Sequence, residues 1–267
     1  MNIFQAFLLG VIQGLTEFLP VSSTAHLLIG QKLLGIPATD AMFSFLVIVQ
    51  LGTIVSLVVY FWKDLLKLVK AFFSKPFSTQ ENKLGWYILI ATIPALVAGY
   101  LLKSAVESLF KTPLLEAAIR LLITAAILAL AEWLGKHNRS LEKMNWLDAL
   151  FIGIAQVIAI FPGASRSGTT ISAGMAHGLE RKSAAHFAFL MSIPVMLAAG
   201  GYQMLDLIKM PNLVNFLLPL AVGFVVAAIV GWLAVRWLLG YLNKHSLNIF
   251  AVYCAVIGAA CLVFALI

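Results

Sequence analysis

Six long apolar stretches constrain the fold of this chain more than any other feature. They cover residues 42–62, 84–104, 113–134, 184–205, 213–239 and 247–267. A helix needs ~20 mostly apolar residues to cross a bilayer, and it satisfies its own backbone polar groups there. The composition agrees, because 62% of the residues are hydrophobic and 11% are charged, against about half and a quarter in soluble domains. We predict an all-α polytopic membrane protein with six spans and a single integral membrane domain over residues 1–267.

Two shorter apolar segments are each interrupted by a proline. Residues 2–19 end at Pro20, and a second short helix then runs from Ser22 to about Leu34. Residues 145–161 end at Pro162, and a second short helix runs to about Gly178. None of these pieces is long enough to span. We predict two re-entrant hairpins, because irregular backbone is tolerated at membrane depth only inside protein or beside a watery cavity.

The two halves of the chain repeat this pattern. Gly10-x-x-Gln13 corresponds to Gly153-x-x-Gln156, and Pro20 through Ser23 corresponds to Pro162 through Ser165. Repeat 1 covers about residues 1–138 and repeat 2 about residues 139–267. Each half contains one hairpin and three spans, and an odd number of spans inverts the second half relative to the first. Inverted repeats place their functional site near the bilayer midplane, where the hairpins are expected to meet.

The positive charges predict the orientation. The net charge of +7 need not indicate nucleic acid, and we expect none as a partner, because Lys and Arg collect in cytoplasmic loops of membrane proteins. Twelve fall on one predicted side: Lys63, Lys67, Lys70, Lys75, Lys83, Lys136, Arg139, Lys143, Arg181, Lys182, Arg236 and Lys244. Four fall on the other: Lys32, Lys103, Lys111 and Lys209. We therefore predict both termini, and the opening of the first hairpin, on the outer side of the membrane.

The second hairpin carries a motif suited to phosphate. An arginine in hydrocarbon costs roughly 2.5–3.5 kcal/mol on insertion scales, so a functional use of Arg166 is expected. Pro162 breaks the preceding helix and Ser165 can cap the next one, whose first turn offers free N–H groups and a positive dipole end. The candidate phosphate-binding residues are Ser165, Arg166, Ser167 and Thr170, with Ser22 from the first hairpin. The alternative is an ordinary serine-capped helix whose arginine snorkels to the membrane surface. We also interpret Arg120 as an arginine that snorkels to the surface.

The first hairpin carries candidate catalytic groups. Gln13 and Glu17 are four residues apart and share a helix face. A buried carboxylate there needs a cation or Arg166 as its partner, and Mg²⁺ or Ca²⁺ bridging Glu17 and phosphate fits best. The alternative is a structural Glu17–Arg166 ion pair. Ser23 and His26 place a hydroxyl near an imidazole, as in an activated nucleophile or a base that activates water.

The segment from Gln13 to His26, with Pro162 through Thr170, closely resembles the bacterial undecaprenyl-diphosphate phosphatase family, also called bacitracin resistance protein. The resemblance covers essentially the whole chain. It implies removal of the terminal phosphate from undecaprenyl diphosphate with a divalent cation, which returns the carrier lipid of cell-wall synthesis. It implies metal-binding roles near Gln13 and Glu17, catalytic roles for Ser23 and His26, and phosphate contacts from Ser165, Arg166 and Thr170. Our candidate catalytic residues are Glu17, Ser23, His26 and Arg166. Many members have Glu at the position of Gln13, so direct metal binding by Gln13 is in doubt, whereas metal binding by Glu17 is expected.

Two further classes compete with this reading. Inverted repeats with broken helices are also typical of transporters, so a flippase for the lipid phosphate is the main alternative. A lipid phosphatase of the acid-phosphatase type is excluded by the absence of its Lys-x6-Arg-Pro, Pro-Ser-Gly-His and Ser-Arg-x5-His-x3-Asp motifs. We expect a location in the bacterial plasma membrane, and the sequence leaves a monomer and a homodimer both open.

Overall fold

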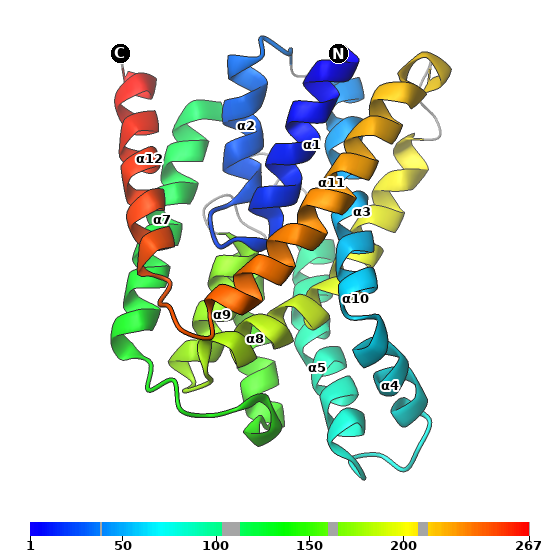
Figure 1. The fold of residues 1–267 in the computed structure, drawn as a ribbon, viewed down its shortest axis with the longest axis vertical. Helices are drawn as coiled ribbons and strands as arrows, with labels where there is room; N and C mark the ends of the chain where they lie inside the picture. The colour runs from blue at the N-terminus through cyan, green and yellow to red at the C-terminus, as the bar shows by residue number, and fades with distance from the viewer. Residues whose placement is uncertain (38, 103–112, 160–164, 208–212, 267) are drawn as a thin grey trace.

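The computed structural model describes residues 1–37, 39–102, 113–159, 165–207 and 213–266, and their regular structure is helical (Figure 1). The elements are α1 (Ile3–Phe18), α2 (Ser23–Leu33), α3 (Asp40–Tyr60), α4 (Trp62–Phe72), α5 (Gln80–Leu101), α7 (Pro113–Leu134), the 3-10 turn η1 (Leu141–Lys143), α8 (Trp146–Ile158), α9 (Arg166–Ala176), α10 (Arg181–Leu207), α11 (Leu213–Tyr241) and α12 (Asn248–Leu266). The predicted all-α class is confirmed for the described part of the chain.

Five helices within the described ranges are long and apolar enough to cross a membrane. These segments are Gln80–Leu101, Leu114–Leu134, Arg181–Gly201, Phe216–Tyr241 and Asn248–Leu266. The pair α3 and α4 would supply a sixth, but the two helices are bent by 77° where they join. Within the described residues, each of the six predicted spans overlaps a long helix. The protein is therefore a multi-pass helical membrane protein.

The basic segment after α3 differs from its prediction. The sequence predicts a basic amphipathic loop after Trp62, whereas residues Trp62–Phe72 form helix α4, which packs on α5. Leu68 is buried, while Lys63, Lys67 and Lys70 are exposed. A helix with one apolar and one cationic face lies well at a membrane surface, and the sharp bend after α3 allows this placement. The prediction recognised the amphipathic pattern but assigned it to a loop.

Two glycines allow the short helices α1 and α8 to approach their neighbours closely. A Cβ added at Gly10 would lie 2.8 Å from the carbonyl oxygen of Gly223 on α11. A Cβ added at Gly153 would lie 2.5 Å from the carbonyl oxygen of Ala91 on α5. Thus α1 packs backbone to backbone on α11, and α8 packs in the same way on α5. These contacts fix both short helices inside the bundle.

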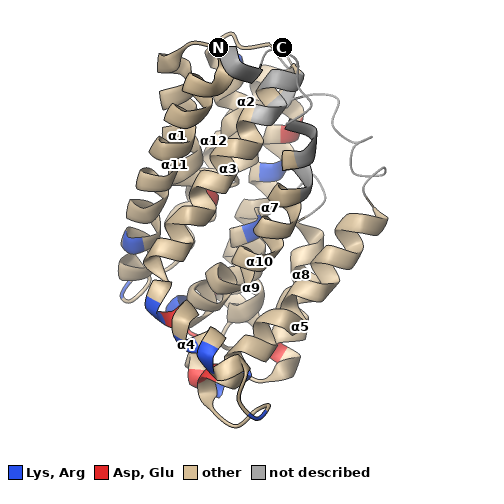
Figure 2. Ribbon diagram, turned by 90° about the vertical axis from the view of Figure 1, so that its right-hand side faces the viewer, with Lys and Arg blue, Asp and Glu red and all other residues tan. Residues whose placement is uncertain are grey.

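The two ends of the molecule differ in charge. The N-terminus and the end of α12 lie together at one end, and α4 with its connection to α5 lies at the other (Figure 1). Most of the Lys and Arg residues visible in Figure 2 gather near α4. Between the ends, α1 and α2 run side by side and α9 lies below their connecting turn (Figure 1). The turn between α1 and α2 therefore lies inside the bundle, close to α9.

Candidate active site

The last turns of α1 carry two buried polar side chains. Gln13 and Glu17 are 2% and 6% exposed, and both belong to the helix face that turns inward. The side-chain amide of Gln13 donates a hydrogen bond to Glu17 Oε2 over 2.9 Å. α1 ends at Phe18 because Leu19 is extended and Pro20 follows, which is the usual effect of proline on the residue before it. This ending leaves Glu17 at the tip of the helix.

The turn into α2 contains a strained residue. Ser22 precedes α2 with φ of +65°, a conformation that non-glycine residues rarely adopt and that often marks functional sites. Its side chain is buried and makes no capping hydrogen bond, although serine usually caps a helix in this position. Its carbonyl oxygen instead lies 2.9 Å from His26 Nδ1. The strained turn therefore holds the histidine ring.

The start of α9 faces this turn. Ser165 caps α9 as predicted, since its Oγ accepts a hydrogen bond from the Gly168 amide over 3.1 Å. Thr124 on α7 accepts the Ser165 amide proton over 3.1 Å. The Ser167 hydroxyl donates to the Leu19 carbonyl oxygen over 3.1 Å, which ties α9 directly to the turn between α1 and α2. Two neighbouring elements thus fix the position of the first residues of α9.

Glu17 bonds to side chains on three helices. Its Oε1 accepts a hydrogen bond from Arg166 over 2.6 Å, and its Oε2 accepts the Ser23 hydroxyl proton over 2.7 Å. The carboxylate thus takes donors from α1, α2 and α9. A buried carboxylate is tolerated when it is paired and fully hydrogen-bonded, and the charged bond to arginine is stronger than a neutral one. The arginine keeps 19% of its side chain exposed, so it can also reach a ligand.

Ser23 and His26 have different partners in the structure. The Ser23 hydroxyl is bonded to Glu17, whereas His26 Nε2 lies 2.8 Å from the hydroxyl of Tyr253 on α12. The sequence predicted this hydroxyl and this imidazole side by side, as an activated nucleophile or as a base that activates water. The geometry instead places the carboxylate beside the serine and the tyrosine beside the histidine.

The predicted phosphate-binding residues lie around Arg166. Ser165, Ser167 and Thr170 are buried at the start of α9. Their hydroxyls bond within the protein: Ser165 Oγ and Ser167 Oγ lie 3.1 Å apart, and Thr170 donates to the Arg166 carbonyl oxygen over 2.8 Å. Pro162 and the rest of the preceding segment, residues 160–164, lie outside the described residues. The hydroxyls therefore shape the helix start, and Arg166 is the charged group of this set.

Charged side chains also hold the base of the second hairpin. Asp148, near the start of α8, is 1% exposed and accepts hydrogen bonds from Arg139 over 3.0 and 2.7 Å. His177 Nδ1, just after α9, lies 2.9 Å from the same carboxylate. Burial raises the pKa of Asp148, but the hydrogen bonds from Arg139 and His177 outweigh it and hold the pKa below its ordinary value. This cluster ties both ends of the hairpin to the preceding loop.

Three residues of the site or its surroundings were missed or misread from the sequence. Tyr253 lies in an apolar run, and tyrosine in a membrane helix usually indicates an interface aromatic. Thr124 has a similarly apolar neighbourhood. The prediction that Arg120 snorkels to the surface is wrong, because the residue is only 5% exposed. No local pattern distinguishes Tyr253 and Thr124, because their partners come from distant parts of the chain.

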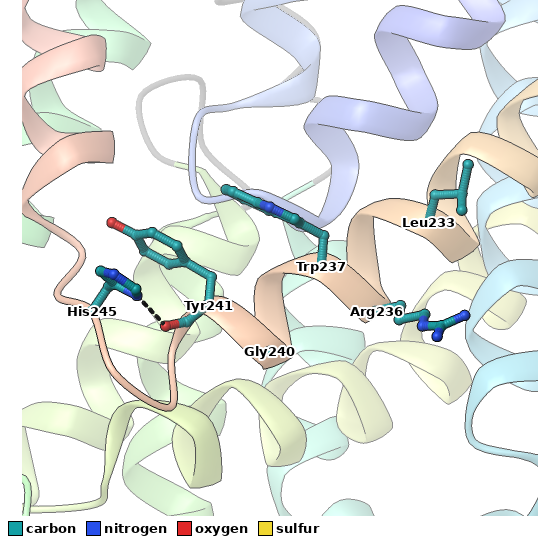
Figure 3. Close-up of a pocket in the computed structure, with 6 residues that line it drawn as sticks. All are labelled: Leu233, Arg236, Trp237, Gly240, Tyr241 and His245. Carbon is teal, nitrogen blue, oxygen red and sulfur yellow. Dashed lines mark hydrogen bonds between the residues drawn. The ribbon is translucent and has the colours of Figure 1, made fainter.

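A separate groove lies on the surface of α11. It is about 560 Å³ in volume and is lined by Leu233, Arg236, Trp237, Gly240, Tyr241 and His245 (Figure 3). The Tyr241 and His245 rings stack with centroids 4.4 Å apart, and His245 Nδ1 bonds to the backbone oxygen of Tyr241 over 3.1 Å. The groove shares no lining residue with the Glu17 cluster. Aromatic and basic side chains of this kind are typical of the membrane interface.

Comparison with known proteins decides the family. The family described as bacitracin resistance protein BacA matches residues 6–260. The chain belongs to this family. Among the relatives of this chain, an undecaprenyl-diphosphatase of Caldicellulosiruptor bescii is 42% identical to it. The alignment covers 100% of this chain and 99% of the relative. Proteins with the same name from Chloroherpeton thalassium and Desulforudis audaxviator are 41% and 40% identical; the alignments cover 97% and 100% of this chain and 95% and 99% of the relatives.

The described residues offer few ligands for a metal. They contain no group of three or more His, Cys, Asp or Glu side chains placed to hold an ion. Glu17 supplies one carboxylate and Ser23 a neutral oxygen beside it, whereas Gln13 turns its amide nitrogen toward Glu17. Mg²⁺ commonly binds through one or two carboxylates and substrate phosphates rather than in an all-protein cage. The site therefore fits a divalent cation that takes most of its ligands from a phosphorylated substrate and water.

Proposed function

We propose that this protein hydrolyses undecaprenyl diphosphate to undecaprenyl phosphate and inorganic phosphate, recycling the carrier lipid for cell-wall synthesis. The names of its relatives and its family membership support the reaction. The observation that carries the site assignment is the Glu17 carboxylate, which receives Arg166 on one oxygen and Ser23 on the other. A carboxylate base, a serine hydroxyl and a guanidinium that can bind an anion are thus in contact inside a membrane protein.

In the reaction we propose, Ser23 is the nucleophile and Glu17 receives its proton. The 2.7 Å hydrogen bond already directs that proton to Glu17 Oε2. Ser23 Oγ bonds to the terminal phosphorus, the bond to the bridging oxygen breaks, and undecaprenyl phosphate leaves. Phosphoryl transfer has a loose transition state in most analyses, so a weak base next to arginine is sufficient. Hydrolysis by water then breaks the serine–phosphorus bond, releases inorganic phosphate and restores the hydroxyl.

Arg166 and the first turn of α9 are the proposed phosphate site. The guanidinium binds phosphate oxygens and offsets charge as the bridging bond breaks. The dipole and free N–H groups at the start of α9 add a positive potential there. Ser165, Ser167 and Thr170 keep this helix start in place, and Ser22 lies at the adjoining turn. His26 is the proposed base for the water of the second step.

A divalent cation, Mg²⁺ or Ca²⁺, is the proposed cofactor. Glu17 would hold it, with the side-chain oxygen of Gln13 as a secondary candidate. When bound, it would neutralise charge on the phosphate oxygens.

We propose the finer architecture on the same grounds as the site. α1 with α2 and α8 with α9 are the two re-entrant hairpins of inverted repeats, about residues 1–138 and 139–267. The packing supports this symmetry, because α1 lies on α11 of the other half and α8 lies on α5 of the other half. Gly10 and Gly153, which correspond in the repeat, each bring a short helix close to the backbone of its partner helix. The basic end near α4 is then cytoplasmic, and both termini and the site opening face outward.

Phosphate release by the purified protein tests the function. In detergent no two compartments exist, so an enzyme releases inorganic phosphate from a polyprenyl diphosphate and a pure flippase does not. We expect release with Mg²⁺ or Ca²⁺ and little release with a chelator. Absence of release in both conditions would favour the transporter.

A cross-linking series at rising detergent-to-protein ratio would separate monomer from homodimer.

The nucleophile is tested separately. Brief reaction with a substrate labelled in its terminal phosphate, followed by acid quenching, should leave label on wild-type protein and none on Ser23→Ala. A Ser23→Ala variant with wild-type turnover would leave only the alternative in which His26 activates water directly.

A further inference from the structure

Tyr253 contacts the site without being part of the sequence motifs. It lies on α12, 227 residues after His26, and its hydroxyl lies 2.8 Å from His26 Nε2. The two rings are nearly parallel, at 9°, with centroids 5.7 Å apart. The tyrosine is 42% exposed, so the pair lies at an accessible edge of the site. A contact that combines a short hydrogen bond with ring stacking fixes both the position and the tilt of an imidazole.

The direction of this hydrogen bond follows from the other ring nitrogen. His26 Nδ1 lies 2.9 Å from the carbonyl oxygen of Ser22, and a carbonyl oxygen can only accept. Nδ1 therefore carries a proton. In a neutral imidazole Nε2 is then the acceptor, and the Tyr253 hydroxyl is the donor. The histidine is held as the Nδ1-protonated tautomer with its basic lone pair on Nε2.

The rest of α12 holds the tyrosine in register with the hairpin. The Cys254 thiol, next in the chain, points to the Pro20 carbonyl oxygen over 3.7 Å. Both α2 and α12 pack on α7 (Figure 1). The strained backbone of Ser22 aims its carbonyl at Nδ1 from the other direction. The Ser22 backbone and the Tyr253 side chain thus each bind one nitrogen of the His26 ring.

We propose that Tyr253 is a positioning residue for the phosphatase reaction, which orients His26 so that Nε2 presents an unprotonated lone pair at the site. Its role in turnover rests on the proposed function. The orientation of the His26 ring does not rest on the proposed function, because the ring is held in this way without substrate. The hydroxyl must give up Nε2 when His26 takes a proton from water, so the same contact holds the base ready and is released during the reaction.

The structure supplies a matched control. Tyr241 also stacks on a histidine, His245, but the bond from His245 Nδ1 goes to the backbone oxygen of Tyr241 (Figure 3). Tyr253→Phe removes a hydroxyl bonded to a ring nitrogen and keeps the stacking. Tyr241→Phe removes a tyrosine hydroxyl from a similar stack and keeps the backbone bond.

Nitrogen NMR of ring-labelled histidine tests the arrangement, with His26→Gln used to assign the signals. We expect His26 to be protonated on Nδ1 and to carry a hydrogen-bonded, unprotonated Nε2. In Tyr253→Phe the Nε2 resonance should move toward that of a free lone pair, while in Tyr241→Phe it should stay in place. A proton on Nε2 of the wild type, or an unmoved resonance in Tyr253→Phe, would overturn the proposal.

Kinetics test the consequence. Loss of one hydrogen bond of ordinary strength should lower kcat of Tyr253→Phe roughly 3- to 10-fold, with KM unchanged within about twofold, because the residue acts on His26. Tyr241→Phe should match the wild type. Full kcat in Tyr253→Phe would overturn the positioning role. Failure of the wild type itself to release phosphate would contradict the proposed function and leave the NMR result standing.

Discussion

At the scale of residues, the site is built around one carboxylate. Glu17 accepts hydrogen bonds from the Gln13 amide and the Ser23 hydroxyl, which are near it in the chain, and from the Arg166 guanidinium, 149 residues away. In a site this buried, removing one charge leaves its partner unpaired in a low-dielectric environment. Glu17 therefore has two separable functions: it neutralises the arginine, and it accepts a proton.

A Glu17→Gln variant should separate these functions. Glutamine can still accept hydrogen bonds from Ser23, but it is a far weaker base and leaves Arg166 without its counter-ion. We expect phosphate release to fall by at least about 100-fold, as for loss of a general base, and the melting temperature to fall as well. Glu142→Gln is the control, because that glutamate is exposed. Near-normal release by Glu17→Gln would remove the carboxylate from the chemistry.

A Gln13→Glu variant tests the metal assignment. The new carboxylate would lie one turn from Glu17, where like charges repel, so the variant should melt below the wild type in chelator. Bound cation offsets that repulsion and stabilises the folded state by mass action. We therefore expect Mg²⁺ to raise the melting temperature of Gln13→Glu more than that of the wild type. Equal responses of the two proteins would place the cation away from this pair.

At the scale of elements, the two short helices depend on close contact with long ones. A methyl group at Gly10 or Gly153 would meet backbone atoms within 2.8 or 2.5 Å. Gly10→Ala and Gly153→Ala should each destabilise the protein by about 1–3 kcal/mol, as overpacking does, and lower activity by shifting a hairpin. Gly201→Ala on α10 is the control, since nothing lies within 4 Å of its added methyl. Thermal melting in detergent measures all three, and an unchanged Gly153→Ala would contradict the close packing of α8.

The Asp148 cluster predicts how the second hairpin responds to pH. The folded-state pKa of Asp148 lies below its ordinary value, which is about 3.9 in unfolded chains. Its stabilising contribution is therefore complete above about pH 4 and is lost as the pH falls through the folded pKa. We expect Asp148→Asn to melt below the wild type at pH 6, and the gap to shrink below about pH 4. A gap that does not depend on pH would show that the charge of Asp148 is not what holds the hairpin.

The elements also show what could be predicted from the sequence. The Ser165 cap was predictable, because proline and serine before a helix act locally. The proximity of Glu17 to Arg166 was predictable because buried charges need partners. Helix α4 was missed because its amphipathic, lysine-rich pattern was assigned to a loop. The Tyr253–His26 contact could not be found, because it depends on which face of α12 turns toward α2, and an apolar helix in lipid leaves that undetermined.

At the scale of the whole molecule, orientation follows from the separation of charge between its two ends. Lys32, near the end of α2, lies at the end that holds both termini, and Ser78 lies in the connection between α4 and α5 at the other end (Figure 1). Both positions are exposed, whereas the native Cys254 and Cys261 are buried and free. Single cysteines at these two positions, with both native cysteines changed to alanine, therefore report the two sides of the membrane.

In intact spheroplasts, a membrane-impermeant maleimide should label Lys32→Cys at once. It should label Ser78→Cys only after the membrane is permeabilised. This outcome follows because a cluster of lysines resists translocation, so the α4 end stays in the cytoplasm. The reverse pattern would turn the molecule over, and the end that holds both termini would then face the cytoplasm. Labelling of both positions before permeabilisation would contradict a fixed orientation, and with it the assignment of the diphosphate to the outer leaflet.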